Sequence, residues 1–424
     1  MNKQVILNEK KNVTNYERVG LLLVFLLLAV SGMEYFYRSQ YNILISFFIA
    51  SFFFFRYKRK INKTFSLVVL LFLIVEAFQY ILFGGFNMWT FSGSYIRLFL
   101  AFAVIAIVGQ KFLTYYVKIM YFLAVVSLIF YAGSFLPGAE NFYVNVLGKL
   151  IPSPFSIEND FYKQMPNIII FNFEDTLFKE NRNSGPFWEP GAFAVFILIA
   201  LLFNQIKEKK FTQKKNIIFI ICLITTFSTA GYLAFFIFIV YINIDVVRKN
   251  ILYSTVFILI LFSSFYLYKS IPFLKDKIEN NINIADETTG SRFGSAQADL
   301  VYFIRSPIVG MGRAGAKNDF KTDFTQENHR NNGIFILLST YGLPFTIVYI
   351  YLIFLSFSAI QAVFHLPKLY PFAAIIIVLI LAFSQALFLK PFLNTFLFLP
   401  SIMNTTKSNK ISPLKLGLKS IKNP

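Results

Sequence analysis

Four arginines and one histidine that could bind an anion gather between 289 and 342 of this 424-residue chain. They are Arg292, Arg305, Arg313, His329 and Arg330. A guanidinium group keeps its charge and pairs in a fork with two phosphate oxygens. The same stretch holds the glycine-rich turn 310–315, whose backbone N–H groups could also face a phosphate. These residues predict a binding site for an anion such as a lipid diphosphate.

A second candidate for chemistry is Glu189, which ends the sequence R-N-S-G-P-F-W-E that begins at residue 182. At the outer mouth of a membrane span, a partly buried carboxyl would be suited to proton transfer. The alternative is a helix-terminal acid, because Pro190 is favoured in the first turn of a helix and the helix dipole favours negative charge there. The sequence leaves both roles open.

The chain is too apolar for a soluble protein of this length. Hydrophobic residues make up 56% of it and charged residues 14%, and its apolar runs approach the roughly 20 residues that span a bilayer. The net charge of +19 comes mostly from Lys and Arg at the ends of these runs, as is typical of cytoplasmic loops. Composition therefore predicts an all-α polytopic membrane protein that does not bind nucleic acid.

Basic clusters predict the side of the membrane that each loop faces. The cluster at 56–63 and the basic N-terminus would be cytoplasmic, which places two long polar loops on the outer side. The lysine-rich end would again be cytoplasmic, and about twelve spans fit this even count. The predicted segments are 1–135 with the first five transmembrane helices, 136–185 as the first long extracytoplasmic loop, 186–270 with the next four helices, 271–330 as the second long loop with an amphipathic helix at 291–304, 331–403 with the C-terminal transmembrane helices, and 404–424 as a basic cytoplasmic tail.

Further details of the spans can be predicted or stay open. The stretch Gly342-Leu-Pro344 either kinks a helix or splits it, and 391–402 is expected to form a short last span. Glu76 lies inside an apolar run, and Arg97 in the next run is its expected ion-pair partner, unless the two belong to a lipid path. The single cysteine, Cys222, is expected to be a small buried hydrophobe.

The order of these motifs resembles the O-antigen polymerase and ligase superfamily, which includes the Wzy-type polymerases. The shared pattern is R-x-x-G-x-x-x-E-P at 182–190, S-R at 291–292, P-x-x-G-x-G at 307–312, and an Asn-Gly helix start at 332–333 that reaches Tyr-Gly at 341–342. Outside 182–191 and 290–342 only the hydropathy agrees. The resemblance implies a fold akin to the GT-C class of membrane-embedded glycosyltransferases.

This resemblance implies an inverting, metal-independent glycosyltransferase of the bacterial cytoplasmic membrane. It would join undecaprenyl-diphosphate-linked oligosaccharide units into an O-antigen, capsule or exopolysaccharide on the outer side. The implied partners are these lipid-linked oligosaccharides, the bilayer and a chain-length regulator protein, and no cofactor is implied. Two alternatives stay open: a ligase that transfers the glycan to lipid A core or another acceptor, and a flippase, although a flippase would favour short loops and charges inside its spans.

The resemblance also implies roles for single residues. Its loop arginines hold the diphosphate, which assigns Arg182, Arg292 and Arg313, with Arg305 beside them. The family's His-Asn pair falls on Asn331-Asn332, next to Arg330, so asparagine stands at the usual histidine position. The catalytic base is then either His329 or Glu189, with a slight preference for Glu189. The acidic triplet Glu158-Asn-Asp160 resembles a metal-binding pair in outline only, and no metal site is expected.

Overall fold

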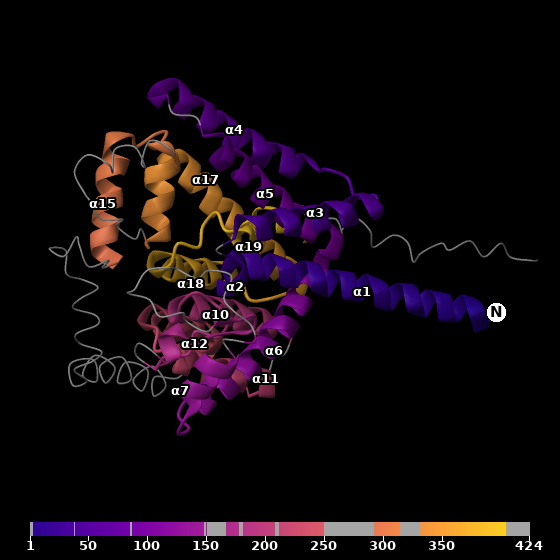
Figure 1. The fold of residues 1–424 in the computed structure, drawn as a ribbon. Coiled ribbons are helices and arrows are strands. Elements are labelled where there is room, and N and C mark those ends of the chain that lie inside the picture. The colour runs from indigo at the N-terminus through magenta and orange to yellow at the C-terminus, as the bar shows by residue number, and fades with distance from the viewer. Residues whose placement is uncertain are drawn as a thin grey trace, which may run out of the picture.

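The computed structural model describes residues 3–403 except 38, 85–86, 148–149, 151–166, 178–180, 208–211, 250–291 and 314–330. The described chain is mostly helical, and its helices lie side by side in one bundle (Figure 1). Several features predicted from the sequence lie outside the described residues, among them His329, Arg330, the triplet 158–160 and the basic tail 404–424. The backbone of Arg292 is described, but its side chain is not.

The N-terminal part of the bundle is built from long helices joined by short turns. They are α1 (Lys3–Gly32), α2 (Glu34–Tyr37), α3 (Gln40–Arg56), α4 (Lys63–Phe83), α5 (Met88–Val108), the turn η1 (Gly109–Lys111) and α6 (Phe112–Gly133). The described parts of the first long loop contain α7 (Ala139–Phe142), η2 (Tyr143–Leu147), the antiparallel pair β1 (Asn167–Ile168) and β2 (Phe171–Asn172), and α9 (Glu174–Leu177).

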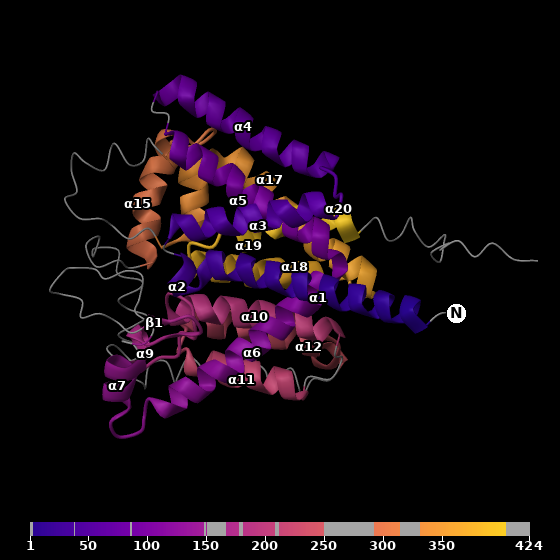
Figure 2. The same cartoon turned by 45° about the vertical axis from the view of Figure 1, so that its right-hand side comes forward.

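The later helices complete the bundle. They are α10 (Pro190–Lys207), α11 (Lys214–Thr225), α12 (Thr229–Lys249), α15 (Arg292–Arg305), α17 (Gly333–Phe364), α18 (Tyr370–Ser384), α19 (Pro391–Asn394), η3 (Thr395–Leu397) and α20 (Leu399–Met403). Helix α15 coincides with the amphipathic helix predicted at 291–304. It ends before Pro307 and packs along α17 (Figure 2).

Four stretches of the described chain are long and apolar enough to cross a membrane: Asn15–Gly32, Lys63–Phe83, Met88–Gly133 and Gly333–Phe364. Shorter apolar helices accompany them at Gln40–Arg56, Pro190–Ile206, Thr229–Ile244 and Tyr370–Ser384. The prediction of a helical, multi-pass membrane protein is confirmed at this level. The total of about twelve spans and the likeness to the GT-C class stay predictions.

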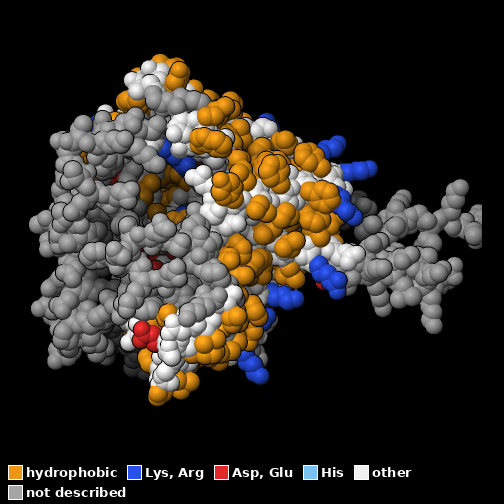
Figure 3. Space-filling model, in the orientation of Figure 1, with side chains coloured by type: hydrophobic (Ala, Val, Ile, Leu, Met, Phe, Trp, Pro, Cys, Tyr) orange, Lys and Arg blue, Asp and Glu red, His pale blue; other side chains and the backbone are white. Residues whose placement is uncertain are grey.

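The two ends of the bundle differ. Helices α7 and α15 lie at one end and the start of α1 lies at the other, in both views (Figures 1 and 2). Apolar side chains cover the middle of the face in Figure 3, and Lys and Arg gather toward the end near the N-terminus. The described parts of the two long loops therefore share one end of the bundle, and the side of the membrane that this end faces stays a prediction.

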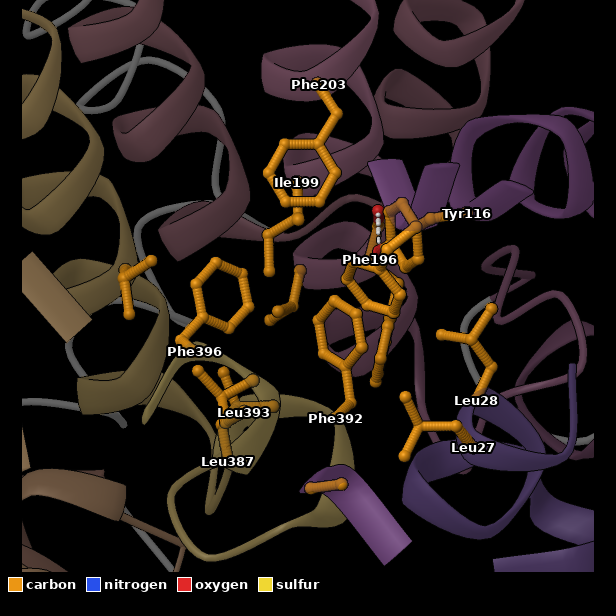
Figure 4. Close-up of a cluster of buried hydrophobic side chains, with 14 of the residues drawn as sticks. Leu27, Leu28, Tyr116, Phe196, Ile199, Phe203, Leu387, Phe392, Leu393 and Phe396 are labelled. Carbon is orange, nitrogen blue, oxygen red and sulfur yellow. Dashed lines mark hydrogen bonds between the residues drawn. The ribbon is translucent and has the colours of Figure 1, made fainter. Parts of the chain in front are cut away.

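The apolar run at 391–402 does not form the short last span expected from the sequence. It breaks into α19, η3 and α20, whose side chains fill the core between α1, α6 and α10 (Figure 4). The ring of Phe392 stacks on Tyr116 at a centroid distance of 4.9 Å and also contacts Phe196. The Phe392 N–H donates to the Ser31 hydroxyl at 2.8 Å, so the non-helical backbone is satisfied inside the protein.

Replacing Phe392 by alanine tests the importance of this buried segment. The side chain is fully buried, so its loss leaves a cavity among aromatic rings and is expected to cost about 3–5 kcal/mol of stability. Thermal unfolding of the detergent-purified variant measures the cost. Phe392→Leu should cost clearly less, and an unchanged unfolding temperature for Phe392→Ala would contradict the packing described.

Candidate active site

A kink in α17 frees backbone groups that hold a neighbouring turn in place. Gly342 has φ +79° inside this helix, and Pro344 has no N–H to offer the Thr340 carbonyl one turn earlier. The kink also breaks the helical hydrogen bond between the Leu343 N–H and the Ser339 carbonyl. Both groups find partners in the turn that follows α15: the Ser339 carbonyl accepts from Met311 N–H, and the Leu343 N–H donates to the Pro307 carbonyl, each at 2.8 Å. The sequence left open whether Gly342-Leu-Pro344 kinks or splits the helix, and the structure shows a kink.

Gln79 of α4 completes this arrangement. Its amide nitrogen donates to the Thr340 carbonyl that Pro344 leaves unpaired within the helix and to the Val309 carbonyl, both at 2.7 Å. The turn lies so close to α17 that a Cβ on Gly310 would come within 2.4–2.5 Å of the Thr340 backbone, and Gly310 itself has φ +73°. Only glycine suits this position, so the P-x-x-G-x-G motif has a structural cause.

This turn presents Arg313 to two other helices. Arg313 lies close enough to Tyr341 of α17 and to Glu76 of α4 for its charge to act on both. The Glu76 carboxylate accepts hydrogen bonds from Tyr95 at 2.7 Å and from Tyr341 at 3.4 Å. Arg313 therefore acts on this carboxyl, and the ion pair expected between Glu76 and Arg97 is not among the contacts of the described residues.

Arg97 brings a second cation from α5. Its guanidinium lies back along its own helix, over Gly93. A Cβ added to Gly93 would lie 3.2 Å from the Arg97 Nη1 atom. The Arg97 side chain is half-buried. Its charge interacts with the charge of Arg313 and with the hydroxyls of Tyr341 and Tyr37. Two half-buried guanidinium groups, on α5 and on the Arg313 turn, thus repel each other.

Lys390 brings a third cation from the loop between α18 and α19. Leu389 before it has φ +68°, a costly conformation for a leucine. The Tyr349 hydroxyl fixes it: this hydroxyl accepts from the Leu389 N–H at 3.2 Å and donates to Asn394 at 2.8 Å. The Lys390 ammonium lies 3.7 Å from the ring centroid of Tyr37 and 5.2 Å from that of Trp188.

The two aromatic rings that contact Lys390 are brought together by backbone pairing. Met33 and Phe187 form an isolated antiparallel bridge, and Glu34 N–H donates to the Pro186 carbonyl at 2.8 Å. The rings of Tyr37 and Trp188 consequently lie 5.4 Å apart. Burial and the charges of Arg97 and Arg313 lower the pKa of Lys390 to about 7, and the Glu34 carboxyl opposes this shift.

Glu189 lies next to this group, directly after Trp188. It stands before the first turn of α10, where its carbonyl accepts from Phe193 N–H at 3.1 Å, as the Pro190 argument predicted. The Gln385 amide donates to its carboxylate. Gly191 leaves room for that amide, since a Cβ there would come 2.4 Å from the Gln385 nitrogen. The structure is compatible with both roles proposed for Glu189.

Arg97, Arg313 and Lys390 are hereafter called the cation cluster. They come from three separate parts of the chain, and Glu34 and Glu76 are the carboxyls that act on them. The three basic side chains outnumber the two carboxyls, so the binding of an anion would balance the charge of the site. A diphosphate is an anion suited to such a site.

Arg182 has a different environment from the cation cluster. Its Nε atom donates to the Thr226 carbonyl at 3.0 Å and its Nη2 atom donates to the Phe227 carbonyl at 3.3 Å, at the turn between α11 and α12. These carbonyls end α11, where a cation is favoured by the helix dipole. The structure therefore places Arg182 among α10–α12 and Arg313 among α4, α5 and α17, and these contacts do not bring the two arginines together.

The remaining predicted residues have local contacts. The Arg305 guanidinium is exposed and lies 5.5 Å from the Tyr302 ring, and Arg292 is the first residue of α15. The Asn331 N–H donates to the Ser295 hydroxyl at 3.0 Å, which ties the start of α17 to α15. Asn332 caps α17, because its side-chain oxygen accepts from Phe335 N–H at 3.2 Å.

Sequence analysis missed Lys390 and gave Arg97 a different role. Lys390 is an isolated cation between the apolar runs 371–389 and 391–403, away from every basic cluster at a cytoplasmic end. An isolated charge at the outer end of an apolar run is a signal that could have identified it. Its closeness to Arg97 and Arg313 depends on the path of the chain and could not be read from spacing.

Part of the chain matches the model of a known protein family. Residues 216–350 match the family model described as O-antigen ligase. The match includes α11, α12, α15, the Arg313 turn and the kink of α17. A search of curated proteins gave no match. The resemblance to the O-antigen polymerase and ligase superfamily is confirmed by this match, which does not distinguish polymerase from ligase.

Substituting Gly310 tests whether the turn positions Arg313. Gly310→Ala combines an unfavourable φ with a clash against the Thr340 backbone, so it should lower the unfolding temperature and move Arg313. Gly138→Ala is a matched control, since Gly138 has φ +79° and a Cβ added there would meet nothing within 4 Å. Equal unfolding temperatures for the two purified variants would contradict the packing of the turn on α17.

Proposed function

We propose that this protein is an inverting glycosyltransferase that polymerises undecaprenyl-diphosphate-linked oligosaccharide units. The cation cluster is the observation that carries the proposal, because it gathers three basic side chains among apolar helices next to the candidate base Glu189. The end with the Lys and Arg clusters would be cytoplasmic, so the cluster would face the outer side of the cytoplasmic membrane. A chain-length regulator protein is the partner expected there.

The lipid part of the donor would lie along α4. The outer face of this helix consists of exposed apolar side chains, including Leu67, Leu70, Ile74, Phe78 and Ile81. The same helix turns Gln79 toward the Arg313 turn and carries Glu76 beside Arg313. A prenyl chain on the outer face of α4 would therefore carry its diphosphate to the cation cluster.

The proposed reaction is a single displacement. An acceptor hydroxyl attacks C1 of the donor sugar while the bond from C1 to the diphosphate oxygen breaks, and the electron pair of that bond leaves with the diphosphate. The proton of the hydroxyl passes to Glu189, which Gln385 orients. The cation cluster opposes the negative charge that grows on the leaving group. Inversion at C1 follows from one displacement.

The ligase reading is the second candidate, since the matching family model carries that description. Both reactions break the same bond and differ only in the acceptor. Purified protein with one synthetic undecaprenyl-diphosphate oligosaccharide separates them. A ladder of longer products identifies a polymerase, whereas transfer that requires an added lipid A core identifies a ligase. An intact donor in both assays would contradict both, and transport of the intact donor across vesicles would identify a flippase.

Arg313→Ala tests the role of the cation cluster. Loss of one charge that stabilises the leaving group should lower kcat by about a hundredfold to a thousandfold. Chain growth is measured on purified protein, with the unfolding temperature as a check on folding. Arg56→Ala is the matched control, because Arg56 is exposed at the end of α3. Normal chain growth by a folded Arg313→Ala protein would remove the cluster from the mechanism.

Glu189→Gln tests the base. Glutamine keeps the shape of the side chain but cannot accept the proton, so kcat should fall by about 10²–10⁴ while donor binding persists. A residue that only stabilises the start of α10 would instead change the unfolding temperature and leave kcat intact. Single-turnover rates and donor affinity, measured together, distinguish the two roles.

A further inference from the structure

One buried asparagine of the first long loop binds the segment that leads to Glu189. Asn172, the second residue of β2, is fully buried. Its backbone N–H donates to the Gly185 carbonyl at 2.6 Å, and its carbonyl accepts from the Ser184 hydroxyl at 3.0 Å. Its side-chain nitrogen donates to the Phe187 carbonyl at 3.0 Å. Asn172 is thus bound to three residues of this segment.

The side-chain amide of Asn172 can take only one orientation. Its oxygen accepts from the Glu174 N–H at 3.0 Å, while its nitrogen faces the Phe187 carbonyl. An exchange of the two atoms would place two acceptors together and two donors together. Because the residue is fully buried, water cannot replace either hydrogen bond. An aspartate or an aliphatic side chain could therefore not hold both groups.

The hydrogen bond to the Phe187 carbonyl fixes the plane of the peptide between Phe187 and Trp188. Phe187 is also held by its backbone bridge with Met33 and by its ring, which stacks on Phe196 at a centroid distance of 4.3 Å. Glu189 follows directly after Trp188, and its own carbonyl is bound in the first turn of α10. The backbone of Glu189 is thus held by the asparagine on one side and by α10 on the other.

The remainder of the described loop keeps Asn172 in place. Strands β1 and β2 pair so that Asn167 lies opposite Asn172. Phe171 and Phe173, its neighbours in the chain, are fully buried and contact the ring of Phe130 of α6 at centroid distances of 5.4 and 5.7 Å. The loop therefore has a small apolar core of its own on the end of α6, and this core supports the asparagine.

We propose that Asn172 is a positioning residue for Glu189, and that the first long loop serves the reaction through this contact. The inference rests on the proposed function. Asn172 holds the backbone that precedes Glu189 and leaves the proton transfer to the carboxylate. A displacement of about 1 Å in a reacting group costs on the order of a hundredfold in rate. The value of kcat should therefore depend on this hydrogen bond, while binding of the donor should not.

Two substitutions test the proposal by kinetics. Asn172→Ala removes both side-chain bonds, and Asn172→Asp keeps the size of the side chain but has no N–H for the Phe187 carbonyl, so either folded variant suffices. We expect kcat to fall by about tenfold to a hundredfold, with the Kd for a farnesyl-diphosphate analogue of the donor unchanged within about twofold. An unchanged kcat, or a weakened Kd at unchanged kcat, would overturn the proposal.

A double-mutant cycle shows whether Asn172 acts through Glu189. In a Glu189→Gln background the substitution of Asn172 should cost less than about twofold in the single-turnover rate, because the carboxylate that it positions is already lost. A further loss as large as the one in the wild-type background would mean that the two residues act independently, and the proposal would fail.

The fluorescence of Trp188 gives a readout that does not depend on activity. The chain contains two tryptophans, Trp89 and Trp188, and Trp89→Phe leaves Trp188 as the single reporter. The Trp188 ring lies 5.4 Å from that of Tyr37. Substitution of Asn172 should shift the emission to the red and increase quenching by acrylamide, because the indole loses its contacts. Unchanged emission from a folded variant would contradict the role of Asn172 in fixing this segment.

Asn204→Ala is the matched control. Asn204 is also a buried asparagine, and its side chain donates to Asn216 at 2.7 Å near the other end of α10. Its loss should lower the unfolding temperature and leave both kcat and the Trp188 emission unchanged.

The outcomes separate this inference from the proposed function. If the wild-type protein elongates the synthetic donor and folded Asn172 variants keep its kcat and emission, the role of Asn172 is refuted and the proposed function stands. If the wild-type protein elongates no donor, the proposed function is refuted, and the catalytic role of Asn172 is refuted with it whatever the emission shows.

Discussion

Repulsion among cations held at one end of an apolar bundle is the constraint on which the account depends. Arg97, Arg313 and Lys390 are each removed partly from water, which disfavours charge, and they act on one another through protein. Glu34 and Glu76 offset this in part. An arrangement of this kind costs free energy in the empty protein and would be relieved by an anion, which is the physical ground for proposing a negatively charged ligand here.

The elements around the cluster are specialised to hold it. The α17 kink breaks helical hydrogen bonds. The carbonyls and the N–H group that it frees bind the Arg313 turn on one side and the side-chain amide of Gln79 on the other. Asn394 of the buried segment 391–403 accepts a hydrogen bond from Tyr349 of α17, and the same hydroxyl accepts from the Leu389 N–H next to Lys390. The interrupted helix at Gly342 and the strained backbone at Leu389 thus each position a charge, while regular helices supply the surrounding apolar wall.

Sequence reasoning succeeded where local chemistry decides. Pro307 and the periodicity before it predicted α15, and Gly342 with Pro344 marked the place of the interruption in α17 but left open whether the helix is kinked or split. It fell short where the path of the chain decides. Arg182 lies in a motif with Glu189, yet it binds carbonyls at 226 and 227. The run 391–402 reads like a span because a segment buried in protein and one buried in lipid have the same composition. The roles of His329 and Arg292 stay predictions.

The most direct test is a structure of the protein with undecaprenyl-diphosphate oligosaccharide bound in a lipid nanodisc. The account predicts that phosphate oxygens lie within hydrogen-bond reach of Arg97, Arg313 and Lys390, with C1 of the first sugar directed toward Glu189. A diphosphate that binds at Arg182 and leaves the cation cluster without a phosphate contact would contradict it.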